Sequence, residues 1–399
     1  MATVTTLLQD ISGIGRDTAR GGYSRPVFST AEQDLRGWFR AEAQCRGLDV
    51  EEDRNGIMWA WWGAPEDGSL VTGSHLDSVP GGGAFDGPLG VASALAAVDL
   101  LRERGTQPRR SLAITVFPEE EGSRFGVACL GSRLLTGGID PDTARNLRDA
   151  EGNSFADTAR ANNLDPRHLG RDETALARIG DFIELHVEQG IGLGEDGPAV
   201  AVGSSVIGHG RWKLTLRGQG NHAGTTLMAD RADPLVAAAQ VVLAVRDTAA
   251  ARPDARATVG RIQPVPGGTN VIASRVDLWL DVRHPDDAVT AELIETIHGK
   301  AQKAAAFEGC TATLTAESLT GTVQLDAGLL RQLRQTLPGA PVLATGAGHD
   351  AGILAGSVPA GMLFVRNPSG ISHSPEEYVE AADAEAGAAA LADVLEDLL

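Results

Sequence analysis

Cysteine is scarce in this chain of 399 residues, which has only Cys45, Cys129 and Cys310. The three are far apart, odd in number and outside any CxxC pair, so the sequence does not indicate a disulfide framework. Thiols in that arrangement are typical of a protein kept in a reducing compartment. We therefore predict a cytoplasmic location.

Positive charge and long apolar runs are lacking as well. Lysine and arginine number 34 against 53 aspartate and glutamate residues, which gives a net charge of -19. Nucleic acids and anionic membranes bind basic patches, so neither is expected as a partner. No run approaches the roughly 18 apolar residues of a membrane span, and residues 1–15 lack the basic start and apolar core of a signal peptide. A small substrate is compatible with this charge, because a local cleft can be positive on an acidic protein.

The composition that is present is ordinary for a globular protein, with 42% hydrophobic and 22% charged residues. The length corresponds to roughly two to three domains. In the first half, helices are predicted over 30–46 and 88–104, and strands over 69–74 and 111–117. The succession of strand, glycine-rich turn, helix and strand predicts an α/β fold with a mixed sheet covered by helices.

The middle of the chain follows a different pattern. Strands are predicted over 211–217, 257–262, 275–283 and 311–317, and helices over 233–246 and 285–307. The order β-α-β-β-α-β is that of a split-βαβ sandwich, so we predict an inserted α+β domain over 208–318. The tail resumes α/β patterning. Because candidate ligands flank the insert on both sides, residues 1–207 and 319–399 are predicted to form one discontinuous catalytic domain.

Five side chains with metal-ligand chemistry lie in compact motifs spread over the chain. They are His75, Asp86, Glu121, His186 and His373. Imidazole and carboxylate together suit zinc or a similar divalent ion. Asp86 is the most informative, because its two oxygens can bridge two ions about 3.5–4 Å apart. A shared Asp86 with two further ligands for each ion would use all five residues.

His75 lies at the end of an apolar run, two residues before Asp77. Positions two apart on an extended strand point the same way, so Asp77 can accept the second ring N–H of His75 and fix its tautomer. The alternative for a lone histidine is a loop residue whose hydrogen bonds are satisfied locally.

The triplet Glu119-Glu120-Glu121 follows a buried strand. A charge run is usually a solvated turn, which is the alternative interpretation. In a partly enclosed site, one carboxylate could bind a metal while its neighbour serves as general base, with its pKa raised by burial and by a like charge. His186 in an alternating strand and His373 in a tight loop are weaker candidates when each is taken alone.

The predicted insert carries a second set of polar residues. His222 lies among small residues and could stabilise a developing oxyanion. Asn270 adds an amide, and Arg283 could bind a substrate carboxylate through two hydrogen bonds, with a surface salt bridge as the alternative. Three further histidines lack supporting neighbours and are interpreted as having no role in the site: His168, His209 and His298.

Eight motifs occur in order between Gly73 and Pro375. They are GSHLDSVPGGGAFDGPLG, EEEGSRFG, ELHVEQG, GNHAGTT, TNVIAS, DVRHPD, GAGHDA and GISHSP. In this order they resemble the bimetallic amidohydrolases that cleave N-carbamoyl-L-amino acids, within the M20 metallopeptidase group. Allantoate amidohydrolases and β-ureidopropionases are close relatives in that group.

The resemblance implies two divalent ions. Zinc is the metal expected, with manganese, cobalt or nickel as alternatives. Two ligand sets that share Asp86 would hold them: His75, Asp86 and His186 for one ion, and Asp86, Glu121 and His373 for the other. Glu120 would be the general base, which takes a proton from the attacking water and returns it to the leaving nitrogen.

The resemblance also implies the substrate contacts. Arg283 and Asn270 would grip the substrate carboxylate, and His222 would polarise the scissile carbonyl. Further positions similar to substrate-contacting ones are Gln189, Gly348 and His349. The insert would join two copies as a homodimer and close over the site as a lid.

The implied reaction is hydrolysis of the ureido C–N bond of an N-carbamoyl-L-amino acid, giving the amino acid, carbon dioxide and ammonia. An allantoate amidohydrolase and a β-ureidopropionase are the enzyme alternatives. A catalytically silent ureide-binding protein, or a structural α/β protein with surface acids that binds no metal, would be a different class. Leu227 and Ala273 replace prolines that are common in the family, which affects the expected side-chain preference and not the chemistry.

Overall fold

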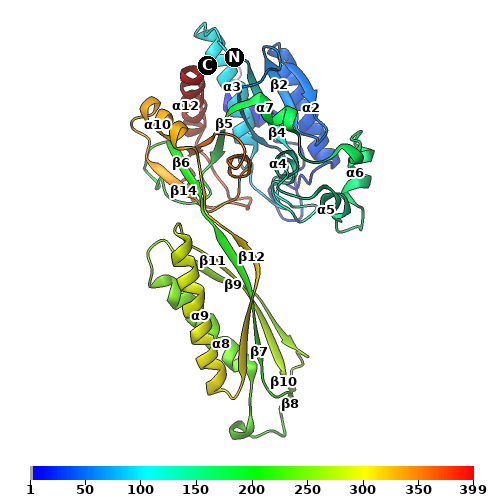
Figure 1. Ribbon diagram of the computed structural model, residues 1–399, viewed down its shortest axis with the longest axis vertical. Coiled ribbons are helices and arrows are strands. Elements are labelled where there is room, and N and C mark those ends of the chain that lie inside the picture. Colours follow the sequence, from blue (N-terminus) through cyan, green and yellow to red (C-terminus); the bar gives the residue numbers. More distant parts are fainter. Residues whose placement is uncertain (1–2) are drawn as a thin grey trace. The chain divides into compact units, whose positions relative to one another are not determined.

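The computed structural model describes residues 3–399, so residues 1 and 2 of the predicted first catalytic segment lie outside the described part. The chain forms two compact units (Figure 1). One, the main unit, consists of the chain up to Val206 together with Gln324–Leu399, and the other, the insert, is Ile207–Val323. The insert extends beyond the predicted 318 because its last long strand continues to Thr320.

The main unit is built on one mixed sheet with the strand order β1-β2-β4-β3-β5-β15-β6-β13, and β14 pairs with β6. The strands are β1 (Asp49–Glu52), β2 (Met58–Trp62), β3 (Ser69–His75), β4 (Leu112–Phe117), β5 (Ile179–Val187), β6 (Val200–Val206), β13 (Val323–Gln324), β14 (Val342–Thr345) and β15 (Ala360–Val365). Strands β4, β3, β5 and β15 are parallel to their neighbours in this run, whereas β1, β2 and β6 pair in antiparallel fashion. The predicted α/β class with a mixed sheet is confirmed.

Helices cover both faces of this sheet. The helices of the main unit are α1 (Val4–Asp10), α2 (Thr30–Cys45), α3 (Pro88–Glu103), α4 (Leu130–Thr136), α5 (Pro141–Asn146), α6 (Phe155–Ala161), α7 (Glu173–Arg178), α10 (Ala327–Thr336), α11 (Asp350–Leu354) and α12 (Ala381–Leu398), with a 3-10 turn η1 (Pro166–His168). Among residues 3–399, none of the helices is both long and apolar enough to cross a bilayer.

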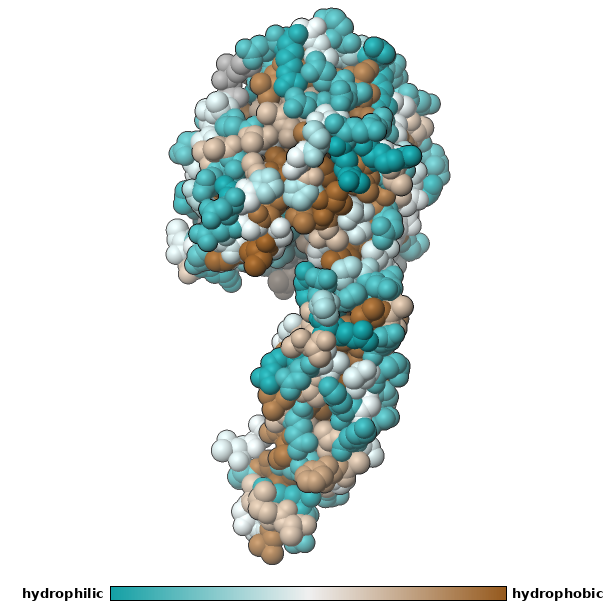
Figure 2. Space-filling view, turned by 90° about the vertical axis from the view of Figure 1, so that its left-hand side faces the viewer, coloured by the Kyte–Doolittle hydropathy of each residue, from teal (hydrophilic) through white to brown (hydrophobic). Residues whose placement is uncertain are grey.

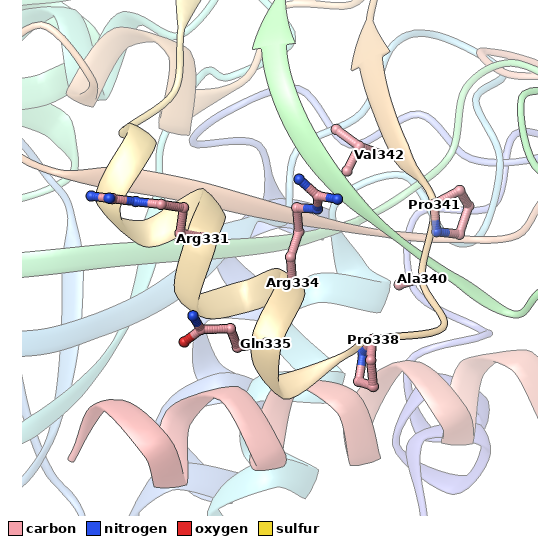
Figure 3. Close-up of a pocket in the computed structure, with 7 residues that line it drawn as sticks. All are labelled: Arg331, Arg334, Gln335, Pro338, Ala340, Pro341 and Val342. Atoms are coloured by element: carbon pink, nitrogen blue, oxygen red, sulfur yellow. The ribbon is translucent and has the colours of Figure 1, made fainter.

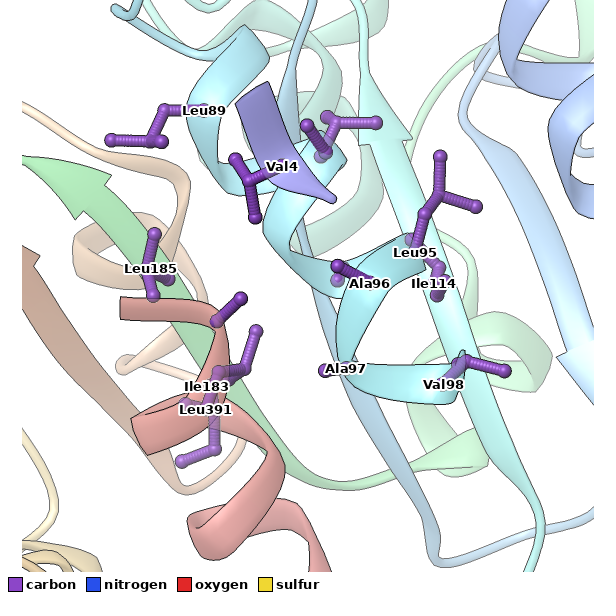
Figure 4. Close-up of a cluster of buried hydrophobic side chains, with 14 of the residues drawn as sticks. Val4, Leu89, Leu95, Ala96, Ala97, Val98, Ile114, Ile183, Leu185 and Leu391 are labelled. Carbon is purple, nitrogen blue, oxygen red and sulfur yellow. The ribbon is translucent and has the colours of Figure 1, made fainter. Parts of the chain in front are cut away.

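The core of the main unit lies around α3, whose residues are almost all buried. Leu95 and Val98 of α3 meet Ile114 of β4, and Leu391 of α12 packs nearby (Figure 4). A second cluster on the opposite face of the sheet contains Trp59, Phe182 and Leu354, where α4, α7 and α11 pack. Because both faces are covered, the central strands β3, β4 and β15 are buried along their whole length and do not alternate between buried and exposed residues. Burying each large apolar side chain contributes roughly 1.5–3 kcal/mol.

The insert has the predicted β-α-β-β-α-β order. Its elements are β7 (His209–Arg217), α8 (Pro234–Ala250), β9 (Arg256–Val265), β11 (Arg275–Arg283), α9 (Asp287–Phe307) and β12 (Thr311–Thr320). The four strands form an antiparallel sheet in the order β12-β7-β11-β9. Leu214 and Leu216 face a core shared with α8 and α9, whereas the alternate residues Arg211, Lys213 and Thr215 lie on the polar side.

A small hairpin-like pair extends one end of the insert. Strands β8 (Asn221–His222) and β10 (Val271–Ile272) pair with each other beyond the Arg217 and Arg275 end of the sheet, near the 3-10 turn η2 (Met228–Asp230).

Figure 2 shows polar and apolar side chains interspersed over one face of the molecule. The separate fold of the insert allows it to be considered apart from the main unit.

Candidate metal centre

The five predicted ligands lie at or just beyond the carboxyl ends of neighbouring parallel strands. His75 ends β3, Glu121 follows β4, His186 is the penultimate residue of β5, and His373 follows β15. Asp86 lies in the loop between β3 and α3. Parallel strands bring their carboxyl ends to one edge of the sheet, where loops supply the ligands. The topology therefore gathers residues that are up to 298 positions apart (His75 to His373).

Asp86 lies between two pairs of ligands. Its Oδ1 is 3.4 Å from Nε2 of His75 and 3.2 Å from Nε2 of His186. Its Oδ2 is 3.5 Å from Nε2 of His373, and that nitrogen is 3.2 Å from Oε2 of Glu121. Each oxygen of Asp86 thus faces one pair. Within each of the two sets that share Asp86, the ligand atoms lie within 4.8 Å of one another.

The orientation of the imidazoles makes this set of ligand atoms suitable for divalent ions. Nδ1 of His75 lies 3.1 Å from the carbonyl oxygen of Asp77, and Nδ1 of His186 lies 2.9 Å from that of Val187. These contacts place the ring proton on Nδ1 and leave Nε2 as the ligand atom. Nε2 of His75 is buried and has no hydrogen-bond partner among the described residues. A buried nitrogen without a partner is costly, whereas a metal ion would satisfy it.

The electrostatics of the cluster are those of charges that compensate one another. Burial alone would raise the pKa of Asp86, but the close imidazoles of His186 and His75, whose Nε2 atoms lie 3.2 and 3.4 Å from Oδ1, outweigh it and hold that pKa well below its usual range. Burial lowers the pKa of His75, but Glu120 and the neighbouring aspartates outweigh it and raise that pKa well above its usual value. A hydrogen bond to Glu121 raises the pKa of His373 to about 9. In the absence of metal ions, protons on the imidazoles offset the negative charge of the neighbouring carboxylates.

The three adjacent glutamates have three different environments. Glu121 faces His373, whereas Oε2 of Glu120 lies 3.6 Å from Nε2 of His75. Burial raises the pKa of Glu120 well above its usual value. Glu119 turns away from the cluster and accepts hydrogen bonds from the backbone N–H of Arg124 (3.0 Å) and Phe125 (2.5 Å). The solvated-turn interpretation of this charge run is wrong, because Glu119 and Glu120 are buried.

Asp77 connects His75 to the glutamate loop. Its carboxylate lies 3.5 Å from Nδ1 of His75 and accepts hydrogen bonds from the backbone N–H of Glu120 (3.2 Å) and Glu121 (3.1 Å). The carboxylate therefore fixes the backbone of two neighbouring acids, whereas the nearer acceptor for Nδ1 of His75 is the backbone carbonyl oxygen of Asp77 at 3.1 Å and not the predicted carboxylate.

Three predicted substrate positions of the main unit lie beside the cluster or lead into it. Nε2 of Gln189 donates to Oδ2 of Asp86 (3.0 Å) and to Oγ of Ser372 (3.1 Å). Its Oε1 is buried and has no partner among residues 3–399. His349 is buried with its ring 4.5 Å from that of His186, and burial lowers its pKa well below the usual value. Gly348, just before it, is exposed.

The predicted residues of the insert fall into two places. His222 and Asn270 are exposed and close together, because β8 pairs with β10 and the N–H of Ala223 donates to the carbonyl oxygen of Asn270 (2.9 Å). Nδ1 of His222 accepts from the N–H of Gly224 (3.1 Å), so Nε2 carries the proton of the neutral ring.

Arg283 lies at the opposite end of the insert's sheet. It ends β11 opposite His209, whereas the pair β8 and β10 lies beyond Arg275 at the start of the same strand. Eight residues of strand separate the two ends by about 26 Å. Nε and Nη2 of Arg283 donate to the two oxygens of Asp281, at 2.7 and 3.0 Å. The fold brings His222 and Asn270 together but not Arg283.

The model of peptidase family M20/M25/M40 matches residues 71–397, a range that contains all five candidate ligands and Glu120. The chain belongs to this family. The relationship indicated by the eight motifs is thereby confirmed.

Relatives of this M20/M25/M40 chain include amidohydrolases named for two kinds of substrate. An N-carbamoyl-L-amino acid amidohydrolase of Geobacillus stearothermophilus is 34% identical, over 96% of this chain and 95% of its own length. An allantoate amidohydrolase of Escherichia coli strain K12 is 31% identical, over 97% and 95%. A crystal structure of a hydantoinase/carbamoylase family amidase from Burkholderia multivorans matches with a TM-score of 0.88 at 29% identity, covering 99% of this chain and 96% of that one.

Several buried acids of this family member were not predicted from its sequence. Glu184 accepts from Oγ of Ser74 (3.0 Å) and from the N–H of Ala351 (2.9 Å), beneath His186. Burial raises the pKa of Asp350 to about 8, and Oγ of Ser132 donates to it (2.5 Å). Glu184 precedes His186 by two strand positions, a spacing that places both on one face and could have identified it. Asp350 had no comparable signal.

A third group of possible ligands, formed by Glu184, His186 and His349, does not have the properties of a further ion site. Both oxygens of Glu184 already accept hydrogen bonds, and Nε2 of His186 faces Asp86. A surface hollow of about 590 Å³ lies elsewhere, between α10 and the segment that leads into β14 (Figure 3). Its lining contains Arg331 and Arg334 but neither an acid nor a histidine, so it adds no ligand.

Proposed function

We propose that this chain is a metal-dependent amidohydrolase that cleaves the ureido C–N bond of an N-carbamoyl-L-amino acid. The observation that carries the proposal is Asp86, which has one oxygen facing each ligand pair, together with the carboxylate of Glu120, which belongs to neither ligand set and lies 3.6 Å from His75. The N-carbamoyl-L-amino acid amidohydrolase and the allantoate amidohydrolase named above both act on ureido compounds, and their similarity along nearly the whole chain supports this class of substrate.

Two divalent ions are proposed, with His75, Asp86 and His186 as one ligand set and Asp86, Glu121 and His373 as the other. Zinc is proposed first, with manganese, cobalt or nickel as alternatives that suit the same ligands. When bound, such ions polarise a carbonyl oxygen and lower the pKa of water toward about 7. Asp77 would hold His75 in the tautomer that presents Nε2.

Glu120 is proposed as the general base. Its Oε2 is directed toward the cluster, and burial raises its pKa, so that it can accept a proton and later return it. Water adds to the carbamoyl carbon as Glu120 takes its proton. The bond between the carbamoyl carbon and the amino-acid nitrogen then breaks, Glu120 gives the proton to that leaving nitrogen, and the carbamic acid that is released decomposes to carbon dioxide and ammonia. The products are the amino acid, carbon dioxide and ammonia.

The substrate contacts are proposed for Gln189, Gly348 and His349 of the main unit and for His222, Asn270 and Arg283 of the insert. Arg283 and Asn270 would bind the carboxylate, and His222 would polarise the carbonyl. Because Arg283 lies about 26 Å along β11 from the end of the sheet beyond which the other two lie, we infer that one copy cannot apply all three to one substrate. We therefore propose a homodimer, joined through the insert, in which the two copies share the substrate contacts.

Exposed apolar side chains on the insert support that dimer. Leu235, Val236 and Leu243 are exposed on α8, and Phe307 at the end of α9 is 83% exposed. Apolar side chains of this size are commonly buried where two copies meet. Light scattering on the purified protein tests the proposal, and a monomer at micromolar concentration would contradict it. All three cysteines are unpaired, and the proposed location remains the cytoplasm.

A substrate panel tests the reaction. Protein reconstituted with zinc or manganese is assayed for ammonia release from N-carbamoyl-L-amino acids, allantoate, 3-ureidopropionate and N-acyl amino acids in parallel. We expect the N-carbamoyl-L-amino acids to have the highest kcat/KM. Faster turnover of allantoate would favour the alternative that the Escherichia coli relative suggests. Binding of these compounds without any turnover would indicate a silent ureide-binding protein and would overturn the proposal.

A further inference from the structure

A buried carboxylate joins two of the loops that carry the candidate ligands. Oε1 of Glu377 accepts hydrogen bonds from the backbone N–H of Phe85 and of Asp86, both at 3.0 Å. Glu377 lies four residues after His373 and is only 4% exposed. The loop that contains Asp86 is thereby bound to the segment that contains His373, although 291 residues separate Asp86 from Glu377.

We propose that Glu377 is a positioning residue of the metal centre, which fixes Asp86 relative to His373 and so sets the affinity of the Asp86, Glu121 and His373 set for its divalent ion. This inference rests on the proposed metal centre and deepens it. Glu377 contacts no reacting group; it acts through the backbone of a ligand.

The segment that carries His373 needs such a restraint. His373 has φ +56°, a left-handed conformation that residues other than glycine keep only where the surroundings impose it. Before His373, Nδ2 of Asn367 donates to the carbonyl oxygen of Ile371 (2.7 Å). After it, the N–H of Glu377 donates to the carbonyl oxygen of Ser374 (3.1 Å), and the Glu377 side chain then reaches the Asp86 loop. The loop is therefore held on both sides of the ligand.

The surroundings of Glu377 are shaped for its carboxylate. Gly83 lies against it, and a Cβ at that position would overlap the Glu377 carboxylate. Oε2 of Glu377 is buried and has no partner among residues 3–399. A buried carboxylate oxygen without a partner is unfavourable for folding alone, so a functional requirement is the better explanation for an acid at this position.

The two ligand sets should depend on Glu377 to different extents. His75 and His186 lie within strands β3 and β5, and their Nδ1 atoms are anchored to backbone carbonyls. Glu121 and His373 lie on loops, where ligand geometry depends on contacts such as those of Glu377. Loss of Glu377 is therefore expected to weaken the ion held by Asp86, Glu121 and His373 more than the other ion, to which Asp86 also contributes.

Zinc titration of chelator-treated protein tests the inference, with a colour-forming competitor as the readout. We expect wild-type protein to bind two ions, and Glu377→Ala to bind one of them about 10- to 100-fold more weakly, as for other residues that orient metal ligands. Glu377→Gln, which keeps an acceptor oxygen, should lie between the two. His373→Ala identifies the ion that is affected. Glu376→Ala is the matched control, because Glu376 is exposed and its recorded side-chain contact is to Ser374.

Gly83→Ala provides a second variant that leaves Glu377 in the chain but displaces its carboxylate. It should weaken the binding of the same ion. If circular dichroism melting shows that Glu377→Ala is unfolded, Gly83→Ala and Glu377→Gln provide the test in its place. Two tight ions in Glu377→Ala, as in Glu376→Ala, would overturn the inference, and so would equal weakening of both ions. Zinc binding is measured without substrate, so an enzyme that hydrolysed no ureide would contradict the proposed function and not this result.

Discussion

The proposed metal centre of the main unit and the polar residues of the insert differ in how their charged side chains are surrounded. His75, Asp86 and Glu120 are buried, and contacts of 3.4 and 3.6 Å join His75 to the two acids. His222 and Asn270 are exposed, and Arg283 is half-buried in an ion pair with an acid two residues away. The side chains of the first group meet partners from distant parts of the chain, whereas the side-chain contacts described above for His222 and Arg283 are with residues two positions away.

This difference indicates what each region is built for. Burying several carboxylates and imidazoles together opposes folding unless ions or protons neutralise them, so a cluster of this kind indicates a bound cofactor. Exposed groups satisfied by local contacts have little effect on folding, and they can contact a ligand without leaving a buried charge unpaired. Substitutions in the two regions should therefore produce different kinds of defect.

The largest effect is expected from Asp86→Ala. Removing the carboxylate that faces both ligand pairs should abolish tight binding of both ions and reduce hydrolysis to the background rate. Elemental analysis after gel filtration measures the metal, and ammonia release measures the activity. His168→Ala is the control, because His168 is exposed and was given no role. If Asp86→Ala still bound two ions, the contrast between a buried cluster that binds metal and the exposed residues of the insert would be wrong.

Glu120→Gln should separate catalysis from metal binding. The amide keeps the shape of the side chain but cannot take the proton of water, so we expect kcat to fall roughly 10²-fold or more while both ions remain. Steady-state kinetics and metal analysis on the same preparation check this. Turnover close to that of the wild type would reject Glu120 as the base and leave the ligand assignment intact.

Arg283→Lys should affect the substrate and not the metal. Lysine keeps the charge but loses the paired hydrogen bonds to a carboxylate, which are worth about 1.5–3 kcal/mol, so KM should rise about 10-fold or more with both ions in place. The comparison is with Arg211→Lys, an exposed arginine of the same sheet that also contacts Asp281. Equal KM values for the two variants would indicate that Arg283 is a surface salt bridge.

The smallest expected effect is on the number of protons released when a metal ion binds. In metal-free protein, the hydrogen bond to Glu121 raises the pKa of His373 to about 9 from 6.5. Its contribution to stability is therefore fully present below about pH 6.5 and is lost as the pH rises through about 9. An ion must displace this proton, so zinc uptake near pH 7.5 should release protons and tighten as the pH rises toward 9.

Calorimetry in buffers of different ionisation enthalpy measures that release. His222→Ala, in the insert, should leave the number of protons unchanged, whereas His373→Ala should lower it. A release that is the same in all three proteins would contradict the assignment of the proton to His373.

Much of the fold was predictable because local patterns specify it. The spacing of Val91, Leu95, Val98 and Leu101 predicted helix α3, and all four side chains are buried in the core. The alternation in 211–217 predicted strand β7 of the insert. The ends of elements were less accurate: helix α8 continues to Ala250, beyond the predicted 246, because its last turns also pack against the core through Val245 and Ala249.

The sequence by itself determined the order of the elements, the residue types able to bind metal, and their places after strands, since these depend on periodicity and on turn chemistry within short segments. Only the tertiary structure decided which glutamate of the triplet faces the ligands, that Glu184, Asp350 and Glu377 surround them, and that Arg283 lies far from His222 and Asn270. These relations depend on contacts between residues up to about 300 positions apart and on strand pairing, and no local pattern encodes the distance between two side chains that meet only after the chain has folded.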